Sequence, residues 1–412
     1  MKQFVSKISL TVVFLFLSIT FLSAQETVSD YLLTAFEDLN LQQYDAQRDF
    51  LSPRNYRLPI IDELELRAGN DELNYEDLQY AVRIRPGNPW KIRRNNAFFN
   101  ATKKELSLRK ELEFKENLLS RYEDVLDYLF EQQFYELVLK QSSLTSQKAT
   151  IFQQNMESDL FDARDFAETK IDQVEKLESL DDVLTEWNQI RKTISVIFGV
   201  SDFDWSTFEL ISVSTIDSLA TELANSSINS KELELIAQRI EVARQEVRVE
   251  KADFDIGYIQ GEYFPFTNRD SEIGYSVGIT IPIFQNNRAQ IAERKLDEIE
   301  LRNEFESEQF QDSVNRVLEY EYLKNLIAHH NQIVQQTEEI DLEHLVQNLA
   351  RVEDYDPIAI LEMKEGILKL EEVLLKSKQR VIEQYLEFLF TFDVLTYQPL
   401  INYLSEDLEP IE

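Results

Sequence analysis

Residues 273–282 read IGYSVGITIP, an alternation of apolar with small or polar residues that ends at a proline. One side of the stretch carries Ile273, Tyr275, Val277 and Ile279, and the other carries Gly274, Ser276, Gly278 and Thr280. Strict alternation predicts a β-strand with one apolar and one polar face. The neighbouring segments are long, charged and helical in their spacing, so an isolated strand there has no core to join.

A second alternating stretch precedes a proline in the first half of the chain. Its apolar positions are Leu78, Tyr80, Val82 and Ile84, and its intervening positions are Gln79, Ala81, Arg83 and Arg85. Both stretches contain Tyr-x-Val-x-Ile followed by a proline. The shared order indicates an internal duplication.

Composition favours long helices over a compact sandwich, because glycine occurs only 8 times in 412 residues and 29% of residues are charged. The formal net charge of −34 argues against a nucleic-acid partner, since an acidic surface repels phosphate backbones. The chain has no cysteine, which removes disulfides, thiolate metal sites and a cysteine-linked lipid anchor.

The N-terminus has the pattern of a secretory signal peptide, predicted for residues 1–24. Two lysines precede an apolar run at 8–22, and small residues at 23–24 precede Gln25. The alternative is a retained membrane anchor, for which this run is short. No later stretch has roughly 18 consecutive apolar residues, so any membrane crossing in the mature chain must be made by strands.

The two halves repeat one order of elements. The first repeat, 25–226, is expected to hold a helix at 28–50, a β-hairpin at 58–86, a long helix at 91–157, a return helix at 159–198 and an irregular link with a short strand. The second repeat, 227–412, is expected to hold a helix at 229–252, a β-hairpin at 253–283, a long helix at 286–352, a return helix at 357–390 and a loose acidic tail.

The lengths of these helices decide the architecture. Each long helix has about 67 residues, or roughly 100 Å at 1.5 Å per residue, which a compact domain cannot enclose. The shorter helices of each half match that length when laid end to end. The sequence therefore predicts a mainly α fold of long antiparallel helical hairpins with a small β part.

Four strands with one apolar face cannot close a sheet inside a membrane. An open edge in a bilayer leaves backbone groups unpaired, and closure needs about eight strands. Three copies of the chain would supply twelve strands around a hydrated lumen. Trp90, just beyond the first hairpin, is either an interfacial anchor or a packing residue. We expect lipid-facing Tyr80, Val82, Ile84, Tyr275, Val277 and Ile279, and lumen-facing Arg83, Arg85, Gly274, Ser276, Gly278 and Thr280.

Three segments carry a resemblance to a known family. Residues 231–254 read KELELIAQRIEVARQEVRVEKADF, residues 275–284 read YSVGITIPIF and residues 288–296 read RAQIAERKL. In this order they resemble the TolC-like outer membrane efflux proteins, whose repeat has an alanine-bearing helix, a strand pair, Pro-Ile-Phe and a long helix. The first half departs from that pattern at 85–89, where RPGNP replaces Pro-Ile-Phe.

The resemblance implies a homotrimer with a twelve-stranded transmembrane β-barrel in the cell outer membrane and an α-helical barrel in the periplasm. Members of the family are passive exit ducts for efflux pumps or type I secretion systems. Their partners are a periplasmic adaptor (membrane fusion) protein and an inner-membrane transporter. Neither a cofactor nor an enzymatic activity is expected.

The resemblance also implies an acidic constriction where each long helix meets its return helix. Asp159 falls on an acidic family position in the first half. In the second half Ala359 replaces one acid, Glu362 matches the next, and Asp354 and Asp356 lie nearby. Threefold symmetry would gather each carboxylate into a ring of three, which favours cations and raises the carboxyl pKa. The competing interpretation is that these acids only stabilise helix N-termini.

Two other classes of protein compete with the duct. One is a soluble periplasmic coiled-coil scaffold or adaptor, in which the apolar face of 273–281 has no evident partner. The other is an enzyme, yet the sequence has no nucleophile elbow, phosphate loop or metal signature. His329 and His330 point to different helix faces, and His344 is too distant to complete a zinc site.

Overall fold

The computed structural model describes residues 27–51, 58–69, 78–157, 162–226, 228–264, 272–280, 287–340, 342–349 and 357–411. Contacts divide the chain into two units that each combine segments from both halves of the sequence. We call residues 39–113 and 229–314 the sheet unit, and the rest the helical unit. Each unit therefore contains parts of both predicted repeats, 25–226 and 227–412. The division of the chain into these two repeats stays a prediction.

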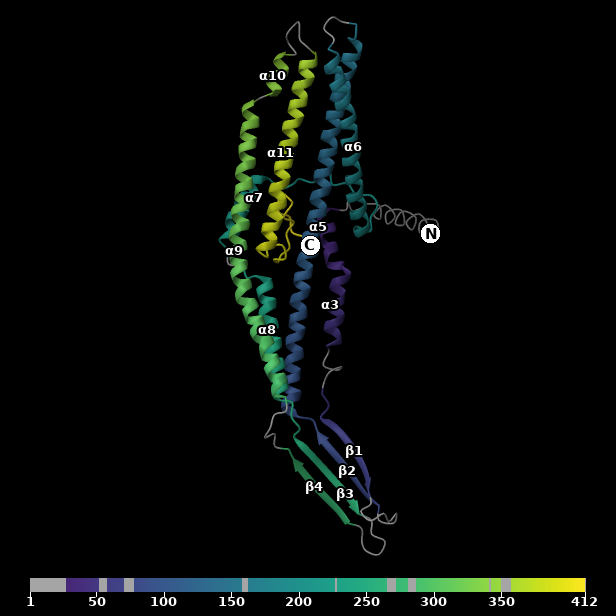
Figure 1. Cartoon of the computed structure of the whole chain (residues 1–412), viewed down its shortest axis with the longest axis vertical. Coiled ribbons are helices and arrows are strands. Elements are labelled where there is room, and N and C mark those ends of the chain that lie inside the picture. Colours follow the sequence, from purple (N-terminus) through teal and green to yellow (C-terminus); the bar gives the residue numbers. More distant parts are fainter. Residues whose placement is uncertain are drawn as a thin grey trace, which may run out of the picture. The chain divides into compact units, whose positions relative to one another are not determined.

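The sheet unit contains one antiparallel four-stranded sheet in the order β1-β2-β3-β4 (Figure 1). Its strands are β1 (Ile61–Gly69), β2 (Gln79–Pro86), β3 (Gly257–Phe264) and β4 (Glu272–Ile279). The two hairpins come from different halves of the chain and join through β2 and β3, where Val82 lies opposite Gly261. The structure confirms the expected mainly α fold with four strands in one chain.

The helices of the sheet unit are α3 (Leu39–Phe50), α8 (Lys231–Lys251), the first part of α5 (Pro89–Gln154) and the first part of α9 (Arg288–Ile340). α8 lies beside both long helices (Figure 1). The amide of Gln238 donates to the carbonyl of Ala101 in α5 at 2.9 Å, and Arg239 pairs with Glu304 of α9 at 2.9 Å. Polar bonds thus hold α8 against both long helices.

One buried asparagine joins two helix ends at the base of the sheet. Asn88 caps α5, because its Oδ1 accepts the backbone N–H groups of Trp90 and Lys91 at 2.9 and 3.2 Å. Its Nδ2 donates to the carbonyls of Ala252 and Phe254, just past α8, at 2.8 and 3.0 Å. The start of α5 and the end of α8 are therefore fixed to each other.

The start of α9 is attached to the same end of α8. The amide of Asn287 donates to the carbonyl of Glu250, one of the last carbonyls of α8, which lack a partner within the helix. β3 then begins at Gly257, whose φ of 112° favours glycine. A Cβ at this position would lie 2.0 Å from the carbonyl oxygen of Gly278, so the close approach of the two strands also requires glycine.

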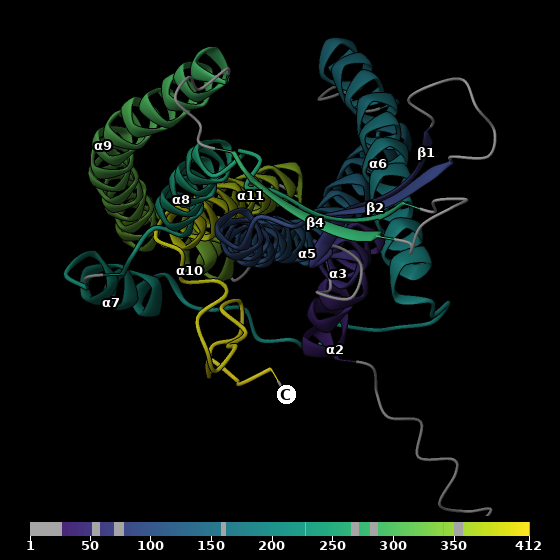
Figure 2. The same ribbon diagram turned by 90° about the horizontal axis from the view of Figure 1, so that it is seen from below.

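The helical unit holds α2 (Val28–Leu33), η1 (Thr34–Glu37), α6 (Ala163–Phe198), α7 (Val213–Ala224), α10 (Leu342–Leu349), α11 (Pro357–Thr391) and the remaining parts of α5 and α9. Within this unit α9, α11, α5 and α6 follow one another in a row (Figures 1 and 2). Gln384 of α11 donates to Glu319 of α9. Gln141 of α5 bonds to Glu372 of α11 and to Lys176 of α6, at 3.1 and 2.6 Å.

The expected single helix at 28–50 was wrong. The structure has α2, η1 and α3 there, and the backbone is extended at Asp38, with ψ at 137°. Aspartate favours such breaks, because its short side chain competes with the helix for backbone hydrogen bonds. α2 begins with a capping box in which the Thr27 and Asp30 side chains bond to each other's backbone N–H.

Of the expected long helix at 286–352, the structure describes α9 up to Ile340 and α10 at Leu342–Leu349. Residues 286, 341 and 350–352 lie outside the described residues, so one continuous helix over this range stays a prediction.

The expected irregular link after residue 199 was wrong for 213–224, which form α7. Ser212 caps this helix by accepting the N–H of Thr215 at 3.2 Å. The isolated bridge between Leu210 and Ser405 is all that the described residues show of the predicted short strand.

The C-terminal tail is packed, whereas the sequence led us to expect a loose segment. Tyr122 of α5 donates its hydroxyl to the carbonyl of Ile401 at 2.8 Å, and the N–H of Ile211 donates to the carbonyl of Leu404 at 2.8 Å. The tail buries apolar side chains among its many acids, namely Phe392, Val394, Leu395, Leu400 and Leu404. This burial offsets the entropy lost on ordering the segment.

A buried ion pair fixes the end of α11 in the helical unit. The Lys115 ammonium lies 2.7 Å from the Asp393 carboxylate, and the two side chains are 8% and 3% exposed. Arg316 of α9 approaches the other carboxylate oxygen at 3.7 Å. Asp393 also has a left-handed φ of 58°, which aspartate and asparagine tolerate better than most residues.

Replacing Asp393 with asparagine should destabilise the protein by about 3 kcal/mol, because it leaves Lys115 buried without a carboxylate while keeping a residue suited to the backbone. The measurement is the thermal midpoint by circular dichroism. Asp297→Asn is the control, since this carboxylate belongs to an exposed pair worth less than about 1 kcal/mol. Equal midpoints for the two variants would contradict the role given to the buried pair.

Candidate functional site

The sheet has one continuous apolar face. The strand register gathers on it Leu64, Leu66, Tyr80, Val82, Ile84, Ile259, Tyr263, Ile273, Tyr275, Val277 and Ile279. Tyr275 is 83% exposed and Ile279 is 78% exposed. A contiguous apolar surface spanning four strands is uncommon on a soluble monomer and marks a surface that lipid or another protein covers.

The opposite face of the sheet is polar or small. It carries Glu63, Glu65, Arg67, Ala81, Arg83, Arg85, Tyr258, Gln260, Glu262, Gly274, Ser276 and Gly278. A Cβ at Gly278 would lie 2.4 Å from the Tyr258 ring, so glycine lets this ring lie flat across β4. The Tyr258 ring therefore lies close to the backbone of β4 on the polar face.

The arginines of the polar face have acidic and aromatic partners. Arg83 donates to the Gln260 amide oxygen at 2.7 Å, lies 3.7 Å from a Glu65 oxygen and stacks 4.2 Å from the centroid of the Tyr258 ring. Arg85 pairs with a neighbouring strand glutamate at 2.7 Å. These bonds compensate the arginine charges, which the sequence alone left without partners. The opposing acids occupy alternate positions of β1, and this alternation was the signal available for them.

The structure places each strand residue singled out from the sequence. The predicted lipid-facing residues lie on the apolar face, and five of the predicted lumen-facing residues lie on the polar face. Thr280 follows the last residue of β4, with its N–H 3.5 Å from the carbonyl oxygen of Ile256. That the apolar face meets lipid, and the polar face a lumen, stays a prediction.

Both outer strands of the sheet have an open edge. Within the described residues, β1 pairs only with β2 and β4 pairs only with β3. Unpaired N–H and C=O groups along such an edge bond to a further strand from another chain. A further strand can therefore pair with either edge of the sheet.

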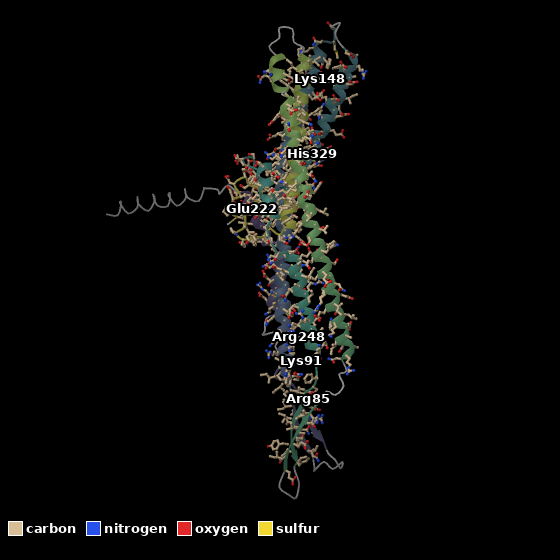
Figure 3. All side chains as sticks on the ribbon, turned by 90° about the vertical axis from the view of Figure 1, so that its left-hand side faces the viewer. Arg85, Lys91, Lys148, Glu222, Arg248 and His329 are labelled. Atoms are coloured by element: carbon tan, nitrogen blue, oxygen red, sulfur yellow. The ribbon has the colours of Figure 1, made fainter. Side chains whose placement is uncertain are left out.

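Of the four acids proposed for a constriction, Asp159, Asp354 and Asp356 lie outside the described residues. Glu362 is on α11, and its carboxylate lies 2.9 Å from the ammonium of Lys148 on α5, which Figure 3 marks. The Glu362 side chain is 57% exposed. Sequence reasoning missed this partner, which compensates the Glu362 charge, and the role of Glu362 stays a prediction.

A neighbouring acid supports the competing interpretation of this region. Asp162 caps α6, with its carboxylate accepting the N–H groups of Arg164 and Asp165 at 2.8 and 3.4 Å. An acid at the start of a return helix thus has a purely structural use in this chain.

If the chain forms the duct expected from the sequence, removing Lys148 should free the Glu362 carboxylate and increase the preference of that duct for cations. Lys148→Ala should shift the reversal potential in a planar bilayer under a salt gradient, and the double variant with Glu362→Ala should restore it. Lys140→Ala is the control, because among the described residues Lys140 has no ion pair. Equal reversal potentials for Lys148→Ala and the double variant would contradict a role for Glu362 in selectivity.

The histidines do not form a metal site. Within the described segments, no group of three or more metal-ligating side chains is close enough to hold an ion. His330 is 9% exposed, and its Nδ1 lies 3.1 Å from the hydroxyl of Ser377 on α11. Burial, followed by the nearby charges of Lys378 and His329, lowers the pKa of His330. His330 is therefore a neutral packing residue between two helices.

The His330 pKa is lower in the folded than in the unfolded protein. The stability that neutral His330 contributes is therefore fully present above the unfolded pKa of about 6.5, and it is lost as the pH falls below that value. Between about pH 7.5 and 5.5, His330→Gln should lose less stability than the wild type, measured as the thermal midpoint. His344→Gln should follow the wild type, since His344 is exposed and is not among the groups that shift the His330 pKa. Parallel curves for wild type and His330→Gln would disprove the assignment.

A cavity of about 380 Å³ in the helical unit is lined by several acids, and two of them have structural partners. Asp204 accepts the N–H of Ser206 at 2.9 Å, and Glu406 accepts the N–H of Ser212 and the hydroxyl of Thr215. The backbone hydrogen bonds lower the pKa of both carboxyls. Ionised capping groups of this kind are poorly suited to donate protons, so these two carboxylates have a structural use.

None of the helices in the described part of the chain is both long enough and apolar enough to cross a membrane.

Comparisons with known proteins identify the fold. No protein-family model and no curated protein matches the sequence. The CmeC outer membrane channel of Campylobacter jejuni is similar in structure, with a TM-score of 0.64, 11% identity and coverage of 93% of this chain and 87% of that chain. The open-state MtrE outer membrane channel of Neisseria gonorrhoeae gives a TM-score of 0.62, 12% identity and coverage of 93% and 90%. The outer membrane protein VceC of Vibrio cholerae gives a TM-score of 0.61 and 13% identity, with coverage of 89% of this chain and 95% of that chain. The chain therefore has the fold of these outer membrane proteins.

Proposed function

We propose that this chain is a TolC-like exit duct of the cell outer membrane, which passively conducts substrates delivered by an inner-membrane transporter and a periplasmic adaptor. The observation that carries the proposal is the exposed apolar face on a sheet with two open edges, in a chain with the fold of outer membrane channels. The predicted signal peptide supports export from the cytoplasm.

A homotrimer satisfies the open edges. β1 of one copy pairs with β4 of the next, and three sheets of four strands close a twelve-stranded barrel without an edge. The apolar faces then meet lipid, and the polar faces line water. The small residues of β4 and the compensated arginines of β2 suit a hydrated lumen of low net charge.

A soluble coiled-coil scaffold is the alternative, and the structure offers it little support. In a scaffold the apolar face needs a covering segment from the same chain. Among the described residues nothing covers this face, because Tyr275, Val277 and Ile279 are each at least 69% exposed. A soluble scaffold would lose free energy by leaving that surface in water.

Adjacent residues of β4 provide a matched test of the two faces. Val277→Lys places a charge on the apolar face and should lower the yield of assembled trimer, because a lysine facing lipid costs about 2–4 kcal/mol near the bilayer midplane. Ser276→Lys adds the same charge to the polar face and should assemble normally while changing single-channel conductance. The measurements are the heat-modifiable trimer band and bilayer recordings. Equal assembly of the two variants would reject the assignment of faces.

The wild type tests the proposal as a whole. Membrane fractionation should place it in the outer membrane, extraction should require detergent, and crosslinking in cells should recover a periplasmic adaptor. A monodisperse monomer in buffer without detergent would favour the scaffold and overturn the duct.

A further inference from the structure

Basic residues gather where the sheet meets the helices, although the chain as a whole is strongly acidic. Residues 87–94, 248–256 and 287–290 together hold six bases and three acids, against a net charge of −34 for the chain. We call these three segments the junction. They belong to the sheet unit, and they are the segments that Asn88 and Asn287 join at the end of α8.

Most bases of the junction have no acidic partner. Arg93, Arg94, Arg248, Lys251 and Arg288 are exposed, and none forms an ion pair with a described residue. Figure 3 marks Arg248 and Lys91 at neighbouring heights along the sheet unit, with Arg85 below them. Two of the three acids are engaged, because Asp253 pairs with Lys91 at 2.7 Å and Asp255 accepts the N–H of Gly257 at 2.8 Å. The junction therefore presents uncompensated positive charge.

Helix stability does not explain all of these charges. The N-terminal end of a helix carries a partial positive charge, so a cation there is unfavourable. Arg288 is the first residue of α9, Lys91 lies in the first turn of α5, and neither helix has an acid in its first turn. Two helices thus begin with the sign of charge that opposes their dipoles. Only Arg248 and Lys251, in the last turn of α8, have a favourable position.

Along the sheet unit, the exposed side chains change from apolar to aromatic to basic. The apolar face ends towards the helices at Ile84, Ile259 and Ile279. Next comes Trp90, which is 61% exposed and has its ring centroid 6.2 Å from that of Phe254. The bases follow. Apolar, then aromatic, then basic is the order in which a membrane presents hydrocarbon, interface and anionic headgroups.

We infer that the junction binds the headgroups of anionic phospholipids in the leaflet at the helical end of the sheet. The inference rests on the proposed membrane location of the sheet. Guanidinium groups bond to phosphate with two parallel N–H donors, and a desolvated interface strengthens this attraction. Such binding would fix the depth of the sheet in the bilayer at the level of Trp90.

A variant of four arginines tests the inference on the full-length trimer in neutral detergent. Its changes are Arg93→Gln, Arg94→Gln, Arg248→Gln and Arg288→Gln. The control removes the same charge from exposed bases of the helical unit by Lys140→Gln, Lys192→Gln, Lys364→Gln and Arg380→Gln. The readout is the thermal midpoint as a function of added phosphatidylglycerol or phosphatidylcholine with identical acyl chains.

Wild type and control should bind phosphatidylglycerol in preference to phosphatidylcholine, and the junction variant should bind it about tenfold more weakly or worse. Raising NaCl from about 50 to 500 mM should remove the preference in the wild type. This test uses the unmodified protein, so its result does not depend on the folding of a variant. A preference that survives in high salt or in the junction variant would overturn the inference. So would an equal loss in the control, or equal stabilisation by soluble glycerol phosphate, which indicates a free phosphate site.

Failure of this inference is distinguishable from failure of the duct. Each preparation is first tested for channel conductance in a bilayer. Conducting trimers without a preference for phosphatidylglycerol overturn only the lipid surface, whereas a wild type that neither forms trimers nor conducts overturns the duct itself.

Discussion

An extended sheet with one apolar face and two open edges constrains the whole protein. Each backbone N–H and C=O group along β1 and β4 needs a partner wherever water is excluded, and the described residues of one chain supply four strands. The apolar face excludes water as soon as lipid covers it. Lipid on the apolar face would therefore leave the edge backbone groups of an isolated sheet unpaired and the sheet unstable. Association of several copies removes this cost, because the edges of neighbouring sheets pair with each other.

The sheet and the helical unit both pair basic residues with acids. The polar face of the sheet matches Arg83 and Arg85 to acids, and the helical unit matches Lys115 to Asp393. Many other acids lie on exposed helical surfaces, where water solvates their charge. Uncompensated bases gather at the junction, so the distribution of charge follows the expected boundary between lipid and water.

The features predicted well from the sequence are those whose signals are local. Alternation over nine residues fixes a strand and its two faces, and apolar spacing fixes a long helix, because each depends on side-chain direction along one element. The break near Asp38 also had a local signal, because Glu37 and Asp38 are adjacent acids. α7 had one in Ser212 and the apolar spacing that follows it, and it was missed because its surroundings look irregular.

Other features depend on residues far apart in the sequence and had no local signal. The packed tail relies on Tyr122 of α5, and the partner of Lys115 lies 278 positions away. The candidate constriction behaves in the same way, since the ion pair of Glu362 depends on how α5 and α11 align. The cap formed by Asn88 was partly readable, because asparagine before proline suits a helix start, but its bonds to the end of α8 were not.

The pairing of β2 with β3 also sets the order of events in folding. These neighbouring strands are separated by α5, α6, α7 and α8 in the chain, so contacts such as that of Val82 with Gly261 close a very long loop. The first hairpin precedes its partner in the chain, so the edge of β2 that later pairs with β3 stays open until the second half of the chain is available.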